Sequence, residues 1–572
     1  MNPSTRLLRP AALILGALLL LSCAGQKPPE GGPIDTVPPL IISTSPRQFA
    51  TQYHDTRILL EFDKYVDHRS VESSIFISPN VGPLEFDWSG REVEIRFSEN
   101  LRPGRTYVVT VGTDVIDLHN HNRMAEAFTL AFSTGDSIDR GAIKGKIFPI
   151  KPTDSPAGVM IFAYNLNGLD PDTLDPSRTK PDFVTQTGQG GEFFLRFLAL
   201  GSYRLLAVRD EYRNLLYDPE ADEFGVPAKD IQLTPSDTMQ TDVWMQLAKE
   251  DTTAPRLIKA TASDQRHLLL ELSQALDTTG IAPGCFQISD TANGSSLEVL
   301  SASVVFPKLT GVLIVTDAQS ADRRYRVRVE NVRDLAGLAI SPIANSLTFS
   351  GSATTDTVGP AVLSVSVADS SRSIDFRPDV EIDFSDAVVQ ASAEEGITLQ
   401  DTSRQQIAST FRWLTDAAVV LRPREKLASK TWYQLRIELG KVRDLVGGSG
   451  TDTVRVWRFQ TVDDELLSSV EGIVRDGSPT DTVGDVLLIA ENIVRKPKET
   501  YQVKLRRPGT FVLRDILEGS YVLHAFRDRN GDQKYDAGRP YPFSRSERFT
   551  YYPDTLKVRA RWPLEGVQLI FH

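Results

Sequence analysis

Short runs in which apolar and polar residues alternate recur along most of the chain. Examples are "RILLEFDK" (57–64), "EVEIRFS" (92–98) and "TYVVTVG" (106–112). A period of two places successive side chains on opposite faces of a strand, and Gly, Pro, Asn and Asp separate the runs at turn positions. The pattern therefore predicts an all-β fold of antiparallel β-sandwiches.

A proline-bounded strand opening occurs three times, and each copy is followed by a second shared signature. The openings are "DTVPP" (35–39), "DTTAP" (251–255) and "DTVGP" (356–360), and the second signatures are "DVIDLHNHN" (114–122), "NVRDLAGLA" (331–339) and "KVRDLVGGS" (441–449). Three copies of the same pair of signatures predict three similar domains in one chain.

These three copies resemble the S-layer-type bacterial Ig-like domain, which is frequent in lipoproteins of the Bacteroidetes group. The resemblance is carried by the strand-opening prolines and the Asp-Leu turns, namely Pro38, Pro39, Pro255, Pro360, Asp117, Leu118, Asp334, Leu335, Asp444 and Leu445. It implies a spacer and interaction module that brings no catalytic residues.

The remaining blocks form a second repeat pair. The segment 191–219, "GEFFLRFLALGSYRLLAVRDEYRNLLYDP", aligns without gaps on 509–537, "GTFVLRDILEGSYVLHAFRDRNGDQKYDA". A glycine-phenylalanine strand, a Gly-Ser-Tyr turn and an alternating strand look like the carboxypeptidase regulatory-like domain, a transthyretin-like sandwich. That family accompanies other domains and is not itself catalytic.

The repeats divide the 572 residues into several domains, as expected because a single core stops growing near ~250–300 residues. We predict a signal peptide at 1–22, a lipidated Pro/Gly-rich tether at 23–35, Ig-like domains at 36–135, 250–351 and 356–462, and carboxypeptidase regulatory-like domains at 138–249 and 466–572. The expected architecture is a tandem array of three Ig-like and two transthyretin-like sandwiches, arranged as an elongated string.

The N-terminus has the pattern of a bacterial lipoprotein signal. Arg6 and Arg9 precede the apolar run "AALILGALLLL" (11–21), which is short for a bilayer span and typical of a signal-peptide core. "LLSC" follows and resembles a lipobox, which implies that Cys23 is lipidated and anchors the chain to a membrane. The alternative is an ordinary secretory signal with an incidental cysteine.

Location and partners follow from the residues around this signal and from the charge. Ala24-Gly25-Gln26 lack the aspartate associated with inner-membrane retention, so we expect an outer-membrane lipoprotein, with the periplasmic and external faces both open. A formal net charge of −12 disfavours nucleic acid as a partner. We expect envelope or outer-membrane proteins as partners, and a small buried side chain at Cys285.

One loop has the oxygen pattern of a calcium site. In "HAFRDRNGDQKYDAGRP" (524–540), the candidate ligands are Asp528, Asn530, Asp532 and Asp536. Ca²⁺ takes six to eight oxygen ligands from flexible loops. The earlier repeat keeps Asp210 and Asp218 but not the middle ligands, while Gln533 and Arg539 depart from the EF-hand pattern. A purely structural hairpin is therefore the alternative, and we expect no other cofactor.

Other chemistry has weaker signals. His119 and His121 suit a solvated turn, with a zinc site as the alternative, and the sequence has no "HExxH", "GxSxG" or phosphate-loop motif. Aromatic residues concentrate near the C-terminus, at Tyr541, Phe543, Phe549, Tyr551 and Tyr552. We expect a non-enzymatic interaction scaffold or accessory subunit of a cell-envelope complex. The alternative is a glycan-binding or glycan-processing lipoprotein of a nutrient-uptake system.

Overall fold

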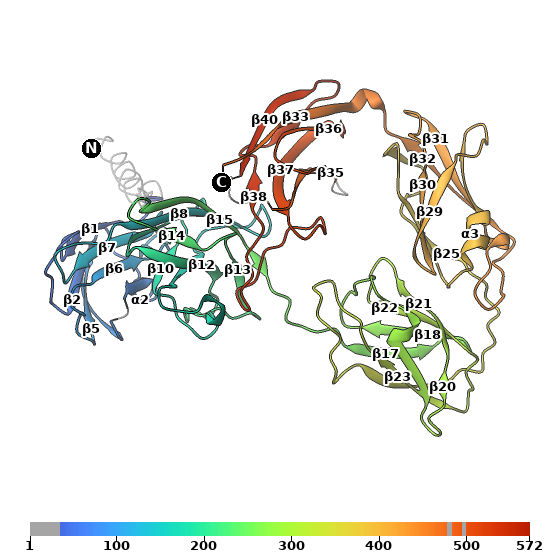
Figure 1. Cartoon of the computed structure of the whole chain (residues 1–572), viewed down its shortest axis with the longest axis horizontal. Helices are drawn as coiled ribbons and strands as arrows, with labels where there is room; N and C mark the ends of the chain where they lie inside the picture. The colour runs from blue at the N-terminus through green and yellow to red at the C-terminus, as the bar shows by residue number, and fades with distance from the viewer. Residues whose placement is uncertain (1–34, 80, 478–482, 495–498, 572) are drawn as a thin grey trace, which may run out of the picture.

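The computed structural model describes residues 35–79, 81–477, 483–494 and 499–571. They form five β-sandwiches in chain order (Figure 1), named here sandwich 1 (41–133), sandwich 2 (141–249), sandwich 3 (257–350), sandwich 4 (362–461) and sandwich 5 (467–571). Within these ranges the only α-helices are α2 (His68–Glu72) and α3 (Gln390–Gly396). The predicted all-β fold is confirmed. No helix in the described parts is both long and apolar enough to cross a bilayer.

Sandwich 1 contains β1 (Ile41–Ser45), β2 (Arg57–Phe62), β3 (Ile75–Ser78), β4 (Leu84–Ser89), β5 (Glu92–Phe97), β6 (Thr106–Val111) and β7 (Phe128–Ser133). Its sheets are β1-β2-β5-β4 and β3-β6-β7. The alternating runs quoted above become β2, β5 and β6, and their apolar positions face the core between the two sheets.

Sandwich 2 contains β8 (Gly141–Phe148), β9 (Met160–Asn165), β10 (Phe183–Gln186), β11 (Glu192–Leu198), β12 (Gly201–Arg209), β13 (Glu223–Gly225), β14 (Ile231–Leu233), β15 (Met239–Gln246) and β16 (Ala248–Lys249). The larger sheet runs β10-β9-β12-β13-β16, with β14 also paired to β12, and the smaller is β11-β8-β15. The β8–β15 pair is parallel.

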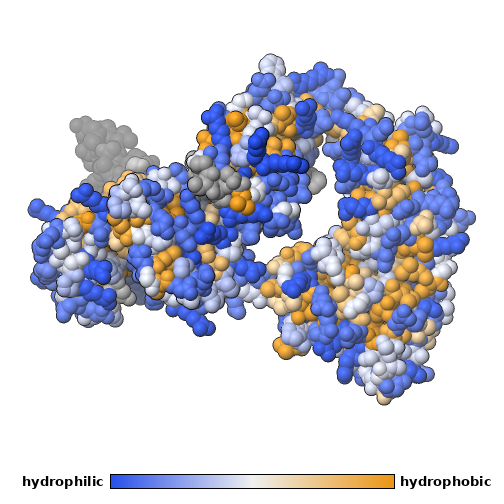
Figure 2. All heavy atoms as spheres, viewed as in Figure 1, coloured by the Kyte–Doolittle hydropathy of each residue, from blue (hydrophilic) through white to orange (hydrophobic). Residues whose placement is uncertain are grey.

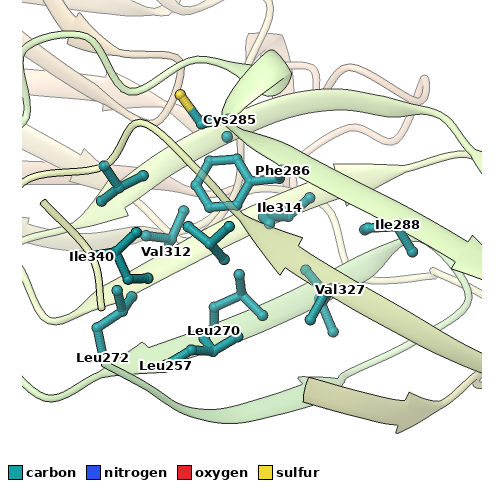
Figure 3. Packing of buried hydrophobic residues seen from close by; sticks show 14 of the residues in the cluster. Leu257, Leu270, Leu272, Cys285, Phe286, Ile288, Val312, Ile314, Val327 and Ile340 are labelled. Atoms are coloured by element: carbon teal, nitrogen blue, oxygen red, sulfur yellow. The ribbon is translucent and has the colours of Figure 1, made fainter. Parts of the chain in front are cut away.

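Sandwich 3 contains β17 (Leu257–Ala262), β18 (His267–Leu272), β19 (Phe286–Asp290), β20 (Ser296–Leu297), β21 (Val299–Val305), β22 (Gly311–Thr316), β23 (Arg324–Val329) and β24 (Ser346–Ser350). Its sheets are β17-β18-β22-β21 and β20-β19-β23-β24. Side chains of both sheets meet in its core (Figure 3), with Leu270, Val312 and Val327 fully buried. Cys285 lies at the edge of this core and is 7% exposed, as expected for a small buried residue.

Sandwich 4 contains β25 (Val362–Val365), β26 (Ser371–Ile374), β27 (Val380–Phe384), β28 (Ile397–Asp401), β29 (Ser409–Thr415), β30 (Ala418–Pro423), β31 (Trp432–Glu438) and β32 (Val454–Thr461). Its sheets are β25-β27-β30-β29 and β26-β32-β31-β28.

Sandwich 5 contains β33 (Leu467–Asp476), β34 (Asp485–Asn492), β35 (Thr500–Leu505), β36 (Thr510–Leu517), β37 (Gly519–Asp528), β38 (Phe549–Tyr551), β39 (Leu556–Val558) and β40 (Leu564–Phe571). Its sheets are β36-β33-β40 and β35-β34-β37-β38, with β39 also paired to β37. The parallel β33–β40 pair corresponds to β8–β15 of sandwich 2.

A buried tyrosine separates the sandwiches into two classes. In sandwiches 1, 3 and 4 its hydroxyl accepts a hydrogen bond from the backbone N–H five residues earlier, at Tyr107, Tyr325 and Tyr433. In sandwiches 2 and 5 it donates to the carbonyl oxygen four residues earlier, at Tyr203 and Tyr521. Each bond satisfies a buried phenol and fixes a strand to the preceding turn. The two classes coincide with the two sequence repeats.

The chain is not an elongated string. Sandwich 5 returns to contact sandwich 2, so sandwiches 2 to 5 form a ring and sandwich 1 lies outside it (Figure 1). The space-filling view shows an opening through the middle of this ring (Figure 2). The expected string is wrong because repeats and linkers indicate the order of domains but carry no signal for a contact between domains far apart in the chain.

Candidate functional site

An aromatic joint closes the ring between sandwiches 2 and 5. The Phe148 ring of β8 lies 5.3 Å from the ring of Phe549 and 5.0 Å from that of Tyr551, both in β38. Trp244 of β15 approaches Phe549 at 6.2 Å. Aromatic pairs at such separations attract each other beyond their buried area. Part of the aromatic cluster expected from the sequence therefore packs within the chain.

A polar contact flanks this aromatic joint. The Arg204 guanidinium, from β12 in sandwich 2, stacks 3.5 Å from the centroid of the Phe543 ring in sandwich 5. Asp230 pairs with Arg204 at 3.0 Å and with Arg545 of sandwich 5 at 3.9 Å. Arg204 is only 4% exposed, so the cation–π contact is largely shielded from water, where such contacts are strongest.

Sandwiches 4 and 5 meet through a small apolar cluster. Phe376 and Val462 on one side contact Leu467 and Leu517 on the other, and all four side chains are buried. Because β32 ends at Thr461 and β33 begins at Leu467, only a few residues connect the two sandwiches. A short connection and a shared apolar cluster restrict motion between them.

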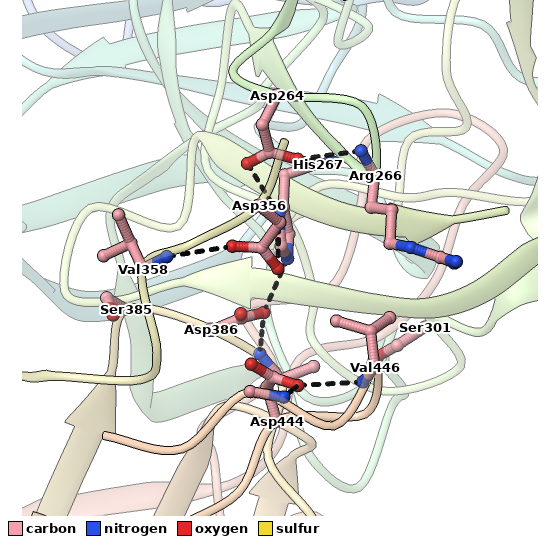
Figure 4. Close-up of polar contacts among 12 residues, drawn as sticks. Asp264, Arg266, His267, Ser301, Asp356, Val358, Ser385, Asp386, Asp444 and Val446 are labelled. Atoms are coloured by element: carbon pink, nitrogen blue, oxygen red, sulfur yellow. Dashed lines mark hydrogen bonds and ion pairs between the residues drawn. The ribbon is translucent and has the colours of Figure 1, made fainter. Parts of the chain in front are cut away.

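The joint between sandwiches 3 and 4 is polar and centres on a histidine (Figure 4). His267 is the first residue of β18 and is 6% exposed. Its Nδ1 lies 2.8 Å from Asp264 Oδ2 in the preceding turn, and its Nε2 lies 3.0 Å from Asp386 Oδ1 in sandwich 4. A second contact crosses the same joint, where the Ser301 hydroxyl donates to Asp416 at 2.6 Å.

Two opposing effects act on this imidazole. Burial disfavours the charged form, but the hydrogen bonds and charges of Asp386 and Asp264 favour it more strongly, and together they raise the pKa of His267 to about 9. Removing one partner of a buried charge pair leaves the other unpaired in a poorly solvated place. The joint therefore depends on all three side chains.

The structure places the candidate calcium ligands in the loop that follows β37. Asp528 is 2% exposed, and its carboxylate accepts hydrogen bonds from the N–H groups of Gly531 and Gln533, at 2.8 and 3.3 Å. Asn530 and Asp532 are exposed and bond to each other at 3.1 Å. Among the described residues, no three acidic or histidine ligand atoms of this loop lie within 4.8 Å of one another.

A further acid, Glu547, completes this loop and was missed by sequence reasoning. It is 3% exposed, and its two carboxylate oxygens accept hydrogen bonds from Arg529 N at 2.7 Å and Asp536 N at 3.1 Å. Burial raises its pKa, and the charges of Asp528 and Asp536 raise it further against the lowering effect of these hydrogen bonds.

Sandwich 2 contains the same arrangement. Asp222 is fully buried and accepts hydrogen bonds from Glu211 N at 3.0 Å and Asp218 N at 2.8 Å. Asp210 holds its own turn through the N–H groups of Asn214 and Leu215. Both loops are thus clamped by a buried acid, so the shared framework is structural whether or not either loop binds a metal.

We expect Asp532→Ala to separate a calcium site from a simple turn. If the later loop binds Ca²⁺, 5 mM Ca²⁺ should raise the melting temperature of sandwich 5 in the wild-type protein relative to chelator, because a ligand that binds only the folded state stabilises it. The rise should disappear in Asp532→Ala, which removes a ligand charge. Scanning calorimetry of the full chain measures it, and an equal rise in both proteins would contradict a site at this loop.

Two other predicted sites have different outcomes. Cys23 lies outside the described residues, so its lipidation stays a prediction. His119 and His121 are exposed, and their backbone N–H groups donate to the Asp117 carboxylate, each at 3.1 Å. Within the described chain neither histidine joins a group of three possible metal ligands, and the assignment to a solvated turn stays a prediction.

Comparison with known proteins identifies two of the sandwiches. The family described as bacterial Ig-like domain matches residues 35–134 and 356–461, which contain sandwiches 1 and 4. A search of curated proteins gives no match. The chain is therefore a multidomain β protein that includes Ig-like domains.

Several solved structures are also similar over parts of the chain. The N-terminal part of the bacterial S-layer protein SbsC is 13% identical over 36% of this chain and 44% of that chain, with a TM-score of 0.17. L,D-transpeptidase 3 from Mycobacterium tuberculosis is 18% identical over 20% of this chain and 41% of that chain, with a TM-score of 0.14. Domains A168–A170 of titin are 11% identical over 49% and 94%, with a TM-score of 0.16. The chain spans less than half the length of the first two.

Proposed function

We propose that this protein is a non-enzymatic, lipid-anchored protein of the bacterial outer membrane that acts as an interaction scaffold or accessory subunit of a cell-envelope complex. The observation that carries the proposal is the ring. Sandwiches 2 to 5 are joined by aromatic, apolar and polar contacts, which fix the relative positions of their outer surfaces. A partner then meets a preorganised surface and loses less entropy on binding.

The polar and aromatic side chains described above make contacts within the protein, which supports the scaffold role over the glycan-binding alternative. His267 and its carboxylate neighbours join two sandwiches, and Glu547 and Asp222 clamp loops. Phe549 and Tyr551 pack against Phe148 of sandwich 2, so these two rings are engaged within the chain.

Affinity purification from detergent-solubilised membranes tests the proposal. Wild-type protein with a C-terminal tag should recover specific envelope proteins, and the variant Phe148→Ala, designed to open the ring, should recover less of them. The matched control is Phe194→Ala, because Phe194 lies on the same small sheet and stacks on Arg196 of its own strand. Recovery of no envelope protein by the wild type, or equal recovery by all three, would contradict the scaffold.

We expect Cys23→Ser to release the protein from membranes. The lipobox resemblance places the lipid on this side chain, and two or more acyl chains hold a protein stably whereas a single chain binds marginally. Incorporation of a fatty-acid analogue should be lost, and membrane fractionation should move the variant to the soluble fraction. Retention on membranes without label would mean that a protein partner, rather than lipid, provides the attachment.

A further inference from the structure

Three carboxylates converge at the joint between sandwiches 3 and 4. Asp356 comes from the linker, Asp386 from the loop after β27 and Asp444 from the Asp-Leu turn, and one oxygen of each lies within 4.8 Å of the others. Asp386 and Asp444 are 5% and 2% exposed. Like charges so close and so poorly solvated repel one another.

The position of Asp386 has a counterpart in sandwich 1. In both sandwiches the residue just before this position donates its backbone N–H to the residue that precedes the first strand. Asp63 N donates to Leu40 O at 2.9 Å, and Ser385 N donates to Ala361 O at 2.8 Å. Two residues after it, a backbone bridge reaches the Asp-Leu turn, Val66 to Asp117 and Val388 to Asp444. By both criteria Asp386 corresponds to Lys64.

This exchange replaces a cation with an anion. In sandwich 1 the Lys64 ammonium lies 2.8 Å from Asp35, which corresponds to Asp356 in the repeated opening, and the charge of Asp117 also favours the protonated lysine. In sandwich 4 the two equivalent acids remain and a third acid takes the place of the lysine. Among the described residues, His267 is the only basic side chain that forms ion pairs with these three acids. It pairs with Asp356 and Asp386 but not with Asp444.

Asp444 also carries a buried oxygen that lacks a partner. Its Oδ1 accepts hydrogen bonds from Val446 N at 2.9 Å and Gly448 N at 2.8 Å, while no described residue donates to Oδ2. In Figure 4 this second oxygen lies on the side of Asp386. In sandwich 1 the equivalent oxygen of Asp117 accepts from the Asn122 side chain at 2.8 Å. A buried carboxylate oxygen without a donor is costly unless something satisfies it.

Sandwich 3 shows which part of this arrangement is special. Asp334 occupies the same turn and also has a buried Oδ2 without a described donor. The residue at the Lys64 position is Gln274 there, and its amide donates to Thr253 O at 2.6 Å. The turns of sandwiches 3 and 4 therefore each leave one oxygen without a described donor. Among the described residues, only the turn acid of sandwich 4 lies within 4.8 Å of two further carboxylates.

We propose that Asp356, Asp386 and Asp444 bind a calcium ion at the joint between sandwiches 3 and 4, in the place that the Lys64 ammonium occupies in sandwich 1. Oxygen ligands from a linker, a loop and a turn suit the variable geometry of Ca²⁺ better than the strict octahedron of Mg²⁺. His267 Nε2 bonds Asp386 Oδ1 and orients this ligand from the neighbouring sandwich, as outer-shell partners do. The ion then ties the linker and sandwich 4 to sandwich 3.

Calorimetric titration of the chelator-treated full chain with CaCl₂ tests the site. We expect wild type to bind Ca²⁺ at this joint, and Asp386→Asn to lower that affinity about tenfold or more, because affinity follows the charge of the ligands. Asp334→Asn, the same turn in sandwich 3, and Asp532→Ala, in the separate loop of sandwich 5, should both retain it. Absence of binding at millimolar Ca²⁺, or binding unchanged in Asp386→Asn, would overturn the proposal.

A second variant guards against a folding defect. Asp386→Lys places an ammonium beside Asp356 and Asp444, as Lys64 lies near two acids in sandwich 1, although it gives up the contact with His267. Sandwich 4 should therefore still show a cooperative melting transition in chelator, and this transition should no longer rise with Ca²⁺. Melting of Asp386→Lys that still rises with Ca²⁺ would overturn the site. A parallel titration with MgCl₂ checks the ion, since tighter binding of Mg²⁺ than of Ca²⁺ would overturn the calcium assignment.

Discussion

Replacing Phe148 by alanine should open the ring. The Phe148 ring contacts both Phe549 and Tyr551 across the joint, and loss of a buried phenylalanine removes ~3–5 kcal/mol in a core. Sandwiches 2 and 5 belong to the same chain, so each meets the other at an effective concentration in the millimolar range. A modest contact energy is therefore enough to keep the joint between them closed. A loss of even half that core value shifts the population strongly towards the open form. We expect a larger radius of gyration in small-angle scattering.

The control for this variant is Phe194→Ala, which removes an aromatic ring from the same sheet but away from the joint. It should leave the scattering profile unchanged. Phe549→Ala should reproduce the effect of Phe148→Ala, and the double variant should add little, because each change removes the same contact. An unchanged radius of gyration in both single variants would show that the Arg204–Phe543 contact and the remaining joints suffice to hold the ring closed.

The individual sandwiches can be predicted from the sequence more fully than their arrangement relative to one another. Alternation in strands such as β2 and β5 indicates which face each strand buries, and a local pattern of this kind can be recognised without knowing the partner strands. Phe148 and Phe549 also lie in strands with alternating residues. The alternation does not distinguish an aromatic ring that packs within its own sandwich from a ring that packs on a different sandwich. The ring is therefore a property of contacts between distant segments.

The candidate sites show the same limit. The spacing of oxygen-bearing side chains points to Asp528, and the gapless alignment of the two repeats points to Asp210, but this alignment ends before the acids that clamp the loops. Glu547 follows Asp536 at a different separation from that between Asp222 and Asp218, since the chain returns to the sheet by connections of unequal length. The joint at His267 combines residues from two repeats, and only the fold brings them together.

The variant Glu547→Ala should strongly destabilise sandwich 5. The Glu547 carboxylate accepts hydrogen bonds from the N–H groups of Arg529 and Asp536, and Glu547 is 3% exposed. Truncation leaves two partly buried backbone donors without this acceptor, and a fully buried unsatisfied donor costs ~1–3 kcal/mol. We expect a loss of about 1–3 kcal/mol in the free energy of unfolding, read from the sandwich 5 transition in calorimetry or urea denaturation.

Two further variants test the reason for this loss. Glu547→Gln has nearly the same shape but only one accepting oxygen, so it should fall between wild type and Glu547→Ala. Asp222→Ala removes the corresponding clamp of sandwich 2, where Glu211 N and Asp218 N lose their acceptor, and it should lower the sandwich 2 transition while leaving sandwich 5 unchanged. If Glu547→Gln is as stable as wild type, one of the two amides does not need the carboxylate. A Glu547→Ala protein that melts like wild type would refute the clamp altogether and leave the loop held by Asp528 alone.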